Sequence, residues 1–307
     1  MVLEVQDIYK NFGEKEVLKG VGFHAASGGA LGLLGRNGAG KTTTIRIIMG
    51  IFRQDAGEVL IDGVPNEDTD VKIGYMPEER GLYPKKNILE QMVYLGELRG
   101  LTAKQAKKRS EYLLERLEAT EYINAKLETL SKGNQQKIQL AIAIIHNPDV
   151  VILDEPFSGL DPVNSAILKQ MLDELVTAGK VVLFSSHQMH YVEEFCKHIC
   201  IIDKGVIVCD GDIKEIKKTY PRNRIFIAPD VGADLFIKDV QAAGGGFIAS
   251  AEEKNGGVVV TLKNDGDRKD LLKLLAQKGC APDTFSVIEP SLTDIFVEKA
   301  GDANEPV

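Results

Sequence analysis

The stretch Gly35-Arg36-Asn37-Gly38-Ala39-Gly40-Lys41-Thr42 lies between a short apolar run at 30–34 and a helical pattern at 43–49. The apolar run is typical of a buried strand. The pattern G-x-x-x-x-G-K-[ST] between a strand and a helix is that of a phosphate-binding loop. Its glycines permit backbone shapes that a Cβ would forbid, so N–H groups can converge on phosphate oxygens at the positive end of the helix. The stretch therefore predicts a nucleoside-triphosphate site. The alternative, a plain glycine-rich turn, is disfavoured by the flanking strand and helix.

Two side chains of this loop have specific predicted roles. Lys41 is expected to neutralise charge on the β- and γ-phosphates, and the Thr42 hydroxyl is expected to ligate Mg²⁺.

A second acidic segment completes the predicted site. Asp154 and Glu155 follow the apolar run at 150–153, which reads as a buried strand. At the edge of a sheet, Asp154 could hold the Mg²⁺ that bridges the phosphates, and Glu155 could act as general base on the attacking water. The alternative is a solvated acidic pair, which the neighbouring phosphate loop makes less attractive.

Composition limits the class of protein. The 307 residues are 44% hydrophobic and 27% charged, which is ordinary for globular domains, and the net charge is -8. An acidic chain is a poor match for nucleic acid, so no nucleic-acid partner is predicted. No apolar run approaches the roughly 18 residues that cross a bilayer, and the first residues lack a secretory pattern. We expect a cytoplasmic chain whose four cysteines are buried or half-buried free thiols; a metal site at Cys196, His198 and Cys200 is the weaker alternative.

Hydrophobic periodicity predicts two domains, at 1–216 and 224–307, separated by a polar stretch that contains Pro221. The first is predicted to be an α/β domain that is interrupted by a helical subdomain at about 78–146. Its predicted strands are 2–7, 30–34, 58–61, 73–77, 149–155, 180–185, 199–202 and 206–209, and its predicted helices are 43–49, 87–99, 103–118, 164–178 and 189–198. The second has strands at 224–227, 247–251, 258–262 and 285–288 and helices at 232–242, 267–278 and 291–300. The order βαββαβ is that of a small α+β, ferredoxin-like domain.

One further segment makes the motifs recognisable as a set. Leu130-Ser131-Lys132-Gly133-Asn134-Gln135-Gln136-Lys137 stands at a helix start, where hydroxyl and N–H groups can contact an anion. Alone it is no more than a capping pattern. In its place between the helical segment and the acidic strand, it resembles the signature of ABC ATPases. Over residues 1 to about 215 the chain thus resembles the ATP-binding subunit of an ABC transporter, a P-loop NTPase. Phe12, the loop Ser158-Gly159-Leu160-Asp161 and His187 match further motifs in family order.

The resemblance assigns site residues. Catalytic roles fall to Glu155, His187, at the γ-phosphate, and Lys41. ATP contacts are assigned to Phe12, Gly35, Asn37, Gly38, Ala39, Gly40, Lys41, Thr42, Thr43, Ser131, Gly133 and Asp161. Mg²⁺ is assigned to Thr42, Asp154 and Glu78, although Glu78 stands where the family usually has glutamine. A carboxylate can reach Mg²⁺ but cannot donate an amide N–H.

The resemblance also implies partners. Two copies are expected to close head-to-tail on two ATP molecules, each nucleotide lying between the phosphate loop of one copy and Ser131 and Gly133 of the other. Hydrolysis would then drive a separate integral membrane permease, with the chain at the inner face of the cell membrane. Docking is expected near 78–99, through Leu82, Tyr83, Ile88 and Met92; packing within the subdomain is the alternative for each.

Two stretches, 77–84 and 289–298, resemble the export subgroup that includes sodium-efflux and drug-resistance ATPases with a C-terminal accessory domain. That domain is expected to serve dimerisation or modulation, with ligand sensing as the alternative. The competing function is a soluble ABC-type ATPase that acts on ribosomes or nucleic acid. Such relatives usually carry two nucleotide domains in one chain, which this sequence lacks.

Overall fold

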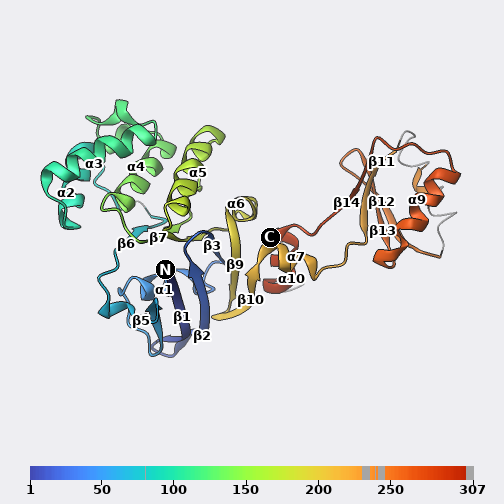
Figure 1. The fold of residues 1–307 in the computed structure, drawn as a ribbon, viewed down its shortest axis with the longest axis horizontal. Coiled ribbons are helices and arrows are strands. Elements are labelled where there is room, and N and C mark those ends of the chain that lie inside the picture. The colour runs from blue at the N-terminus through green and yellow to red at the C-terminus, as the bar shows by residue number, and fades with distance from the viewer. Residues whose placement is uncertain (80, 230–235, 239, 241–245, 302–307) are drawn as a thin grey trace. The chain divides into compact units, whose positions relative to one another are not determined.

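The computed structural model describes residues 1–79, 81–229, 236–238, 240 and 246–301 (Figure 1). The chain divides into two compact units. The first is Met1–Ile213 with Phe296–Val307, and the second is Lys214–Ile295. The sequence placed all of 224–307 in the second domain. In the structure the boundary between the two units falls within the last helix, α10 (Leu292–Ala300), whose residues from Phe296 onward group with the first unit.

The first unit contains an antiparallel sheet in the order β2-β1-β4-β5. Its strands are β1 (Val2–Phe12), β2 (Lys15–Ala26), β4 (Ala56–Ile61) and β5 (Val64–Pro65). The predicted strand at 2–7 therefore continues to Phe12. It does so because β2 pairs with β1 along its whole length, and a turn at Gly13, with φ +62°, closes the hairpin.

The second sheet of this unit has the order β10-β9-β3-β8-β7-β6. Its strands are β3 (Ala30–Leu34), β6 (Ile73–Met76), β7 (Val150–Asp154), β8 (Val181–Ser185), β9 (Cys196–Asp203) and β10 (Val206–Asp212). All neighbours are parallel except β9 and β10. Every residue of β3, β7 and β8 is buried, as the continuous apolar runs predicted. The carboxyl ends of these three strands meet at one edge, where the predicted site residues follow them.

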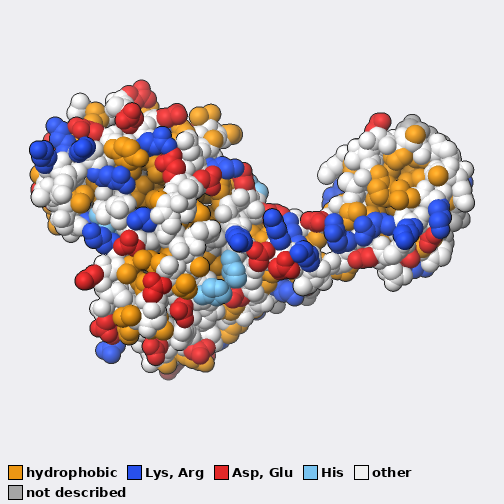
Figure 2. Space-filling model, viewed as in Figure 1, with side chains coloured by type: hydrophobic (Ala, Val, Ile, Leu, Met, Phe, Trp, Pro, Cys, Tyr) orange, Lys and Arg blue, Asp and Glu red, His pale blue; other side chains and the backbone are white. Residues whose placement is uncertain are grey.

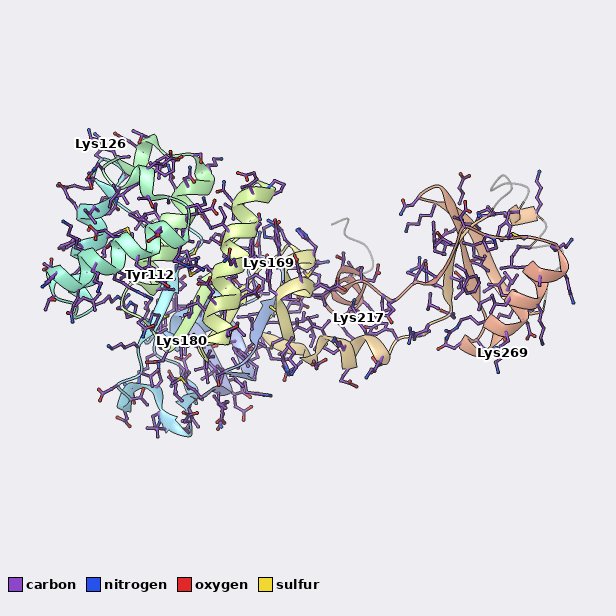
Figure 3. All side chains as sticks on the ribbon, turned by 45° about the horizontal axis from the view of Figure 1, so that its top comes forward. Tyr112, Lys126, Lys169, Lys180, Lys217 and Lys269 are labelled. Atoms are coloured by element: carbon purple, nitrogen blue, oxygen red, sulfur yellow. The ribbon has the colours of Figure 1, made fainter. Side chains whose placement is uncertain are left out.

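Helices α2, α3 and α4 pack against one another on one side of the first unit (Figure 1). The helices of the first unit are α1 (Lys41–Ile48), α2 (Ile88–Leu98), α3 (Ala103–Arg116), α4 (Lys132–Ile144), α5 (Pro162–Thr177) and α6 (Met189–Phe195), and α7 (Ile213–Lys218) follows β10. Short 3₁₀ turns lie at Asn66–Asp68, Thr120–Tyr122, Leu127–Thr129 and Asp265–Asp267. Lys169 on α5 forms an ion pair with Glu194 on α6 (Figure 3).

The predicted helix at 189–198 was wrong at its end. Helix α6 stops at Phe195, because Cys196 is extended and pairs with Ala30 as the first residue of β9. Cys196 and Cys200 are therefore both strand residues, and both are buried.

One hydrophobic core joins both sheets to α1. It contains Leu3 and Val21 from the first sheet, Leu33 from the second, and Ile45 and Ile48 from α1. The N-terminus of α1 is thereby fixed against β3, and the phosphate loop is held between two packed elements.

The second unit is built on a four-stranded antiparallel sheet in the order β12-β13-β11-β14. Its strands are β11 (Arg224–Ala228), β12 (Ile248–Lys254), β13 (Gly257–Leu262) and β14 (Thr284–Val287), and helix α9 (Arg268–Gln277) follows β13. Alternate residues of β11 and β13, such as Ile225 with Ile227 and Val258 with Val260, share one buried core with Leu271 of α9. This strand order is that of a ferredoxin-like sandwich, as predicted. The predicted helix at 232–242 lies mostly outside the described residues.

Candidate nucleotide-binding site

The phosphate loop is shaped by glycines that no other residue could replace freely. Gly40 caps α1 with φ +118°, and a Cβ there would lie 2.6 Å from Cδ2 of Leu18 on β2. A Cβ on Gly35 would lie 2.5 Å from the carbonyl oxygen of Ile202 on β9. The loop is thus pressed against both neighbouring strands, while Asn37 and Gly38 remain exposed. Exposed backbone at the start of a helix is what phosphate binding requires.

Lys41 is held at the mouth of this loop. Its Nζ donates to the carbonyl oxygens of Gly35, at 2.6 Å, and Arg36, at 3.2 Å. Burial lowers the pKa of the Lys41 ammonium, and the charges of Glu155, Asp154 and Glu78 oppose that shift. Three carboxylates from two strand ends therefore act on one ammonium group. Lys41, Asp154, Glu155 and Glu78 therefore interact electrostatically, and the roles predicted for them stay predictions.

Asp154 ends β7 and lies beside Ser185, which ends β8. The Ser185 hydroxyl donates to Oδ1 of Asp154, and both side chains are buried. The parallel register of β7 and β8 thus fixes one oxygen of the carboxylate and leaves the other for a ligand. Thr42 and Thr43 open α1, Thr42 with an exposed side chain and Thr43 half-buried.

Backbone and side-chain hydrogen bonds restrain Glu155. Its φ is +51°, and its backbone N–H donates to Ser185 O at 3.0 Å. Its carboxylate accepts from Ser186 Oγ, at 3.2 Å, and from the backbone N–H of His187, at 2.9 Å. His187 Nδ1 lies 2.8 Å from Glu155 Oε1. Burial raises the pKa of the Glu155 carboxyl, and the contacts from His187 and Ser186 work against this rise.

His187 itself is 63% exposed, so the imidazole that holds Glu155 also faces outward. The ring can therefore contact a ligand above the loop without leaving its carboxylate partner. Its predicted contact with the γ-phosphate stays a prediction.

The signature segment starts α4. Ser131 is the exposed N-cap, and its Oγ accepts from Asn134 N at 3.3 Å. Gly133 is buried against α5, because a Cβ there would lie 2.7 Å from Nδ2 of Asn164. Three residues further on, Gln136 donates to the carbonyl oxygens of Glu155, at 3.3 Å, and Pro156, at 3.1 Å. The signature helix is therefore tied to the segment that carries the base.

Asp161 has a clear role within its own chain. It is the N-cap of α5, and its carboxylate accepts from the backbone N–H groups of Val163 and Asn164, each at 2.9 Å. Hydrogen bonds from Asn164 lower the pKa of the Asp161 carboxyl. The predicted coupling between two copies through this loop stays a prediction.

Phe12 and Glu78 are both accessible. Phe12 ends β1 with 44% exposure, and its ring meets the Phe52 ring edge-on at 5.3 Å between centroids. An exposed ring supported from beneath suits stacking on a planar base. Glu78 follows β6 and is exposed, and its negative charge opposes the lowering of the Lys41 pKa by burial.

The donor set fits Mg²⁺ rather than a protein-built metal centre. Within residues 1–79, 81–229 and the other described ranges, no three His, Cys, Asp or Glu side chains gather as a metal site. Mg²⁺ usually takes one or two carboxylates and leaves its other positions to phosphate and water, which Asp154, Glu78 and the Thr42 hydroxyl permit. Burial raises the pKa of the Cys196 and Cys200 thiols, which agrees with the prediction of buried free thiols.

Several residues that build this site escaped sequence reasoning. They are Ser185 and Ser186, which bond the two acidic residues, and Gln136 and Gln139, which are buried on α4. These residues could have been found from polar side chains at positions where the pattern predicts apolar ones. Two serines follow the apolar run at 181–184, and the glutamines lie on the buried face of a helix.

The predicted docking segment is only partly accessible. Ile88 and Met92 are fully buried in the helical subdomain, so the expectation that they offer contacts was wrong. Tyr83 and Tyr94 are each about half exposed and line a pocket of about 370 Å³ with Lys86, Glu90 and Gln91. Figure 2 shows hydrophobic side chains among lysine and arginine on the face of the helical subdomain that it draws.

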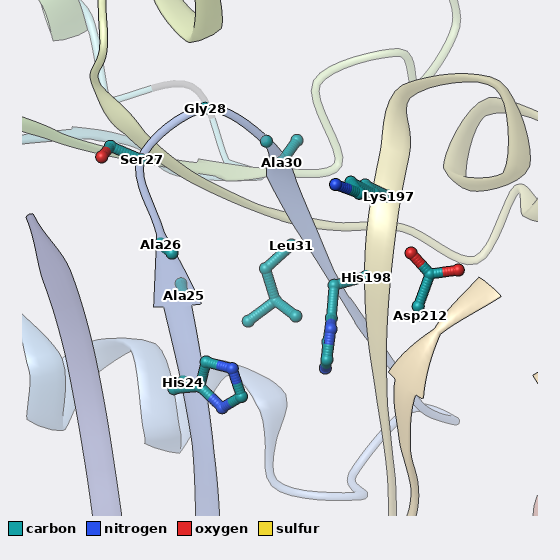
Figure 4. Close-up of a pocket in the computed structure, with 11 residues that line it drawn as sticks. His24, Ala25, Ala26, Ser27, Gly28, Ala30, Leu31, Lys197, His198 and Asp212 are labelled. Carbon is teal, nitrogen blue, oxygen red and sulfur yellow. The ribbon is translucent and has the colours of Figure 1, made fainter. Parts of the chain in front are cut away.

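A separate pocket lies where β2 approaches β9, and Figure 4 shows its lining. The rings of His24 and His198 are 5.3 Å apart between centroids, and His198 Nε2 lies 2.9 Å from Asp210 Oδ1. None of the predicted nucleotide-binding residues lines this pocket.

Known proteins match the chain in both of its parts. Residues 18–158 match the family model described as "ABC transporter", and residues 211–300 match "ATP-binding protein DrrA1-3-like, C-terminal domain". An uncharacterized ABC transporter ATP-binding protein, YhaQ of Bacillus subtilis (strain 168), is 42% identical over 98% of this chain and 99% of its own length. The linearmycin resistance ATP-binding protein LnrL of the same strain is 37% identical, covering 68% of this chain and 69% of its own.

A solved dimeric post-hydrolysis state of the ATP-binding cassette MJ0796, bound to ADP and Pi, superimposes with a TM-score of 0.62 at 25% identity. The match covers 69% of this chain and 98% of that one. In the part of the chain that the structure describes, no helix has the length and apolar character needed to cross a membrane.

Proposed function

The chain belongs to the ABC transporter ATP-binding proteins, which are ATPases, and from that premise we propose that it powers export of a solute through a separate membrane-spanning chain. The observation that carries the catalytic part is the buried Glu155 carboxylate directly after β7, held by Ser186 Oγ, the backbone N–H of His187 and His187 Nδ1. In this arrangement Glu155 would serve as the base, and the neighbouring Asp154 would serve as a metal ligand.

Each residue has a distinct task in ATP hydrolysis. Lys41 and the exposed N–H groups of the loop bind the β- and γ-phosphates. Thr42, Asp154 and Glu78 would hold Mg²⁺, which when bound supplies positive charge to the phosphate oxygens. Glu155 accepts the proton of the attacking water, and His187 keeps the Glu155 carboxylate in place through Nδ1.

Two copies are proposed to share each nucleotide head-to-tail. The exposed Ser131 at the start of α4 offers a hydroxyl and a helix N-terminus to an anion, although its own chain already has a complete phosphate loop. In a dimer, Ser131 would contact the nucleotide that is bound to the phosphate loop of the other copy, which explains why the chain has a second anion-binding element. The dimeric, ADP-bound relative supports this arrangement.

The membrane partner is proposed to dock on the helical subdomain at Tyr83 and Tyr94. Both side chains are exposed beside the pocket described above, and large exposed aromatic residues are common anchors of protein interfaces. This docking would hold the chain at the inner face of the membrane.

The proposed cargo class is sodium or a drug. The match to a linearmycin resistance ATP-binding protein favours drug efflux of the two. The alternative, a soluble ABC-type ATPase acting on ribosomes or nucleic acid, would have to overcome a net charge of -8.

The test is to co-purify the chain with its membrane partner and reconstitute both in liposomes. We expect Mg-ATP turnover to be stimulated by a transported drug or by sodium, and Tyr83→Ser with Tyr94→Ser to lose that stimulation while basal turnover persists. Stimulation by ribosomes or nucleic acid, with no membrane chain retained, would support the alternative.

A further inference from the structure

Gln139 of α4 bonds the backbone on both sides of Glu78. Its Nε2 donates to the carbonyl oxygen of Pro77, at 2.6 Å, and to that of Glu79, at 3.3 Å. The Gln139 side chain is 3% exposed, so these hydrogen bonds are shielded from water. The buried amide of Gln139 thus holds the backbone on both sides of Glu78, the residue that stands in place of the usual glutamine.

The segment that carries Glu78 has little other support. Strand β6 lies at the edge of its sheet and ends at Met76, and Pro77 cannot donate a backbone hydrogen bond. Glu78 is exposed, so packing does not fix it. Its position therefore depends on how the backbone at 77–79 is anchored.

The orientation of the Gln139 amide is fixed by its partners. Two carbonyl oxygens require the NH₂ group to face the loop, since an amide oxygen there would repel them. The Gln139 oxygen is then buried without a donor among the described residues. An unsatisfied buried acceptor costs stability, so the residue is explained by what its amide donates rather than by packing.

Helix α4 makes a matching contact with the other acidic segment. Gln136, one turn before Gln139, donates to the carbonyl oxygens of Glu155 and Pro156. The same helix begins at Ser131. One helix therefore joins the signature to the backbone of Glu155 and to the residues on both sides of Glu78.

We propose that Gln139 is a positioning residue for ATP hydrolysis: it fixes the backbone on both sides of Glu78 and transmits displacement of α4 to Glu78. The inference rests on the metal-binding role proposed for Glu78. It predicts that Gln139 matters only while residue 78 carries a carboxylate.

A double-mutant cycle tests this dependence. Steady-state turnover is measured for the full chain, Glu78→Ala, Gln139→Leu and the double variant. We expect Gln139→Leu to lower kcat about tenfold, because a small misplacement of a catalytic group costs that much or more. In the Glu78→Ala background the same substitution should change kcat by less than about twofold, because residues acting through one another are non-additive.

Hydrogen exchange supplies a readout apart from turnover. Gln139→Leu should speed exchange of amides at 78–79 and leave other segments unchanged. The matched control is Gln91→Leu, a glutamine that is equally buried and accepts from Tyr83 N, at 3.3 Å, while donating to Lys86 O. The control should speed amide exchange at 83–86 and leave amide exchange at 78–79 as in the unmodified chain. Gln139→Met, unbranched and of similar size, replaces the leucine variant if that one fails to fold.

The outcomes separate two failures. Unchanged turnover in Glu78→Ala would overturn the role of Glu78, and with it the premise. A strong effect of Glu78→Ala, together with an equal loss from Gln139→Leu in both backgrounds, would overturn the positioning role while leaving the proposed function intact.

Discussion

Glu155 has a buried carboxylate that lies beside the exposed imidazole of His187. Burial raises its pKa above the ordinary value of 4.5, which moves the group toward the working range of a general base. The same burial makes the ionised form costly to the fold. The folded state binds the Glu155 proton more tightly than the unfolded state does. The protonated carboxyl therefore adds its full contribution to the stability of the fold at pH values below its unfolded-state pKa. That contribution is lost as pH rises through the raised pKa of the folded state.

The first prediction is that Glu155→Gln at pH 7 binds ATP but turns it over about 10²–10⁴-fold more slowly, since the base is gone. The variant should also melt at a higher temperature than the unmodified chain, because a neutral amide replaces a buried carboxylate. This gain should shrink below pH 4.5, where the carboxyl is protonated in both states. Calorimetry at pH 7 and pH 4 with a turnover assay checks both parts. Normal turnover, or a melting temperature below that of the unmodified chain at pH 7, would remove Glu155 from this role.

At the scale of elements, the site depends on how a strand passes into a helix. Gly40 and Gly38 both have positive φ, at +118° and +80°. A Cβ on Gly38 would meet open space, whereas one on Gly40 would collide with Leu18 on β2. An alanine at position 38 would therefore cause backbone strain alone, whereas an alanine at position 40 would cause both backbone strain and a steric collision.

The second prediction compares these positions. Gly38→Ala should weaken ATP binding by about fivefold, the effect of roughly 1 kcal/mol of backbone strain. Gly40→Ala should weaken it by about 100-fold or more, because the start of α1 must also move away from β2. Titration with a fluorescent nucleotide, with circular dichroism to confirm folding, gives both values. Equal affinities for the two variants would mean that the contact with Leu18 does not shape the loop.

The elements that were predicted correctly have local patterns. The run at 30–34, the glycine-rich loop and the strand ending in Asp154 and Glu155 are each legible within about ten residues. The end of α6 cannot be read from a local pattern, because Cys196 becomes a strand residue by pairing with Ala30, which is distant in sequence. Ser185 beside Asp154 likewise follows from the register of β7 and β8. Ile88 and Met92 have helical spacing, but which face of α2 is buried depends on the helices packed against it.

At the scale of the whole molecule, the proposed enzyme is a symmetric pair. A two-fold dimer repeats one interface, so Ser131 of each copy would serve the phosphate loop of the other. Two inactive variants can then repair each other. Lys41→Ala damages the phosphate loop and keeps the signature. Ser131→Asp keeps a good helix cap but sets a negative charge against the γ-phosphate.

The most direct test is ATP turnover by an equimolar mixture of these two variants, neither of which should be active alone. The shared site predicts that mixing restores about a quarter of the normal rate, since half of the dimers are mixed and each of those holds one intact site of two. A mixture as inactive as its components, although mixed dimers form, would contradict the claim that two copies of this chain build each site together.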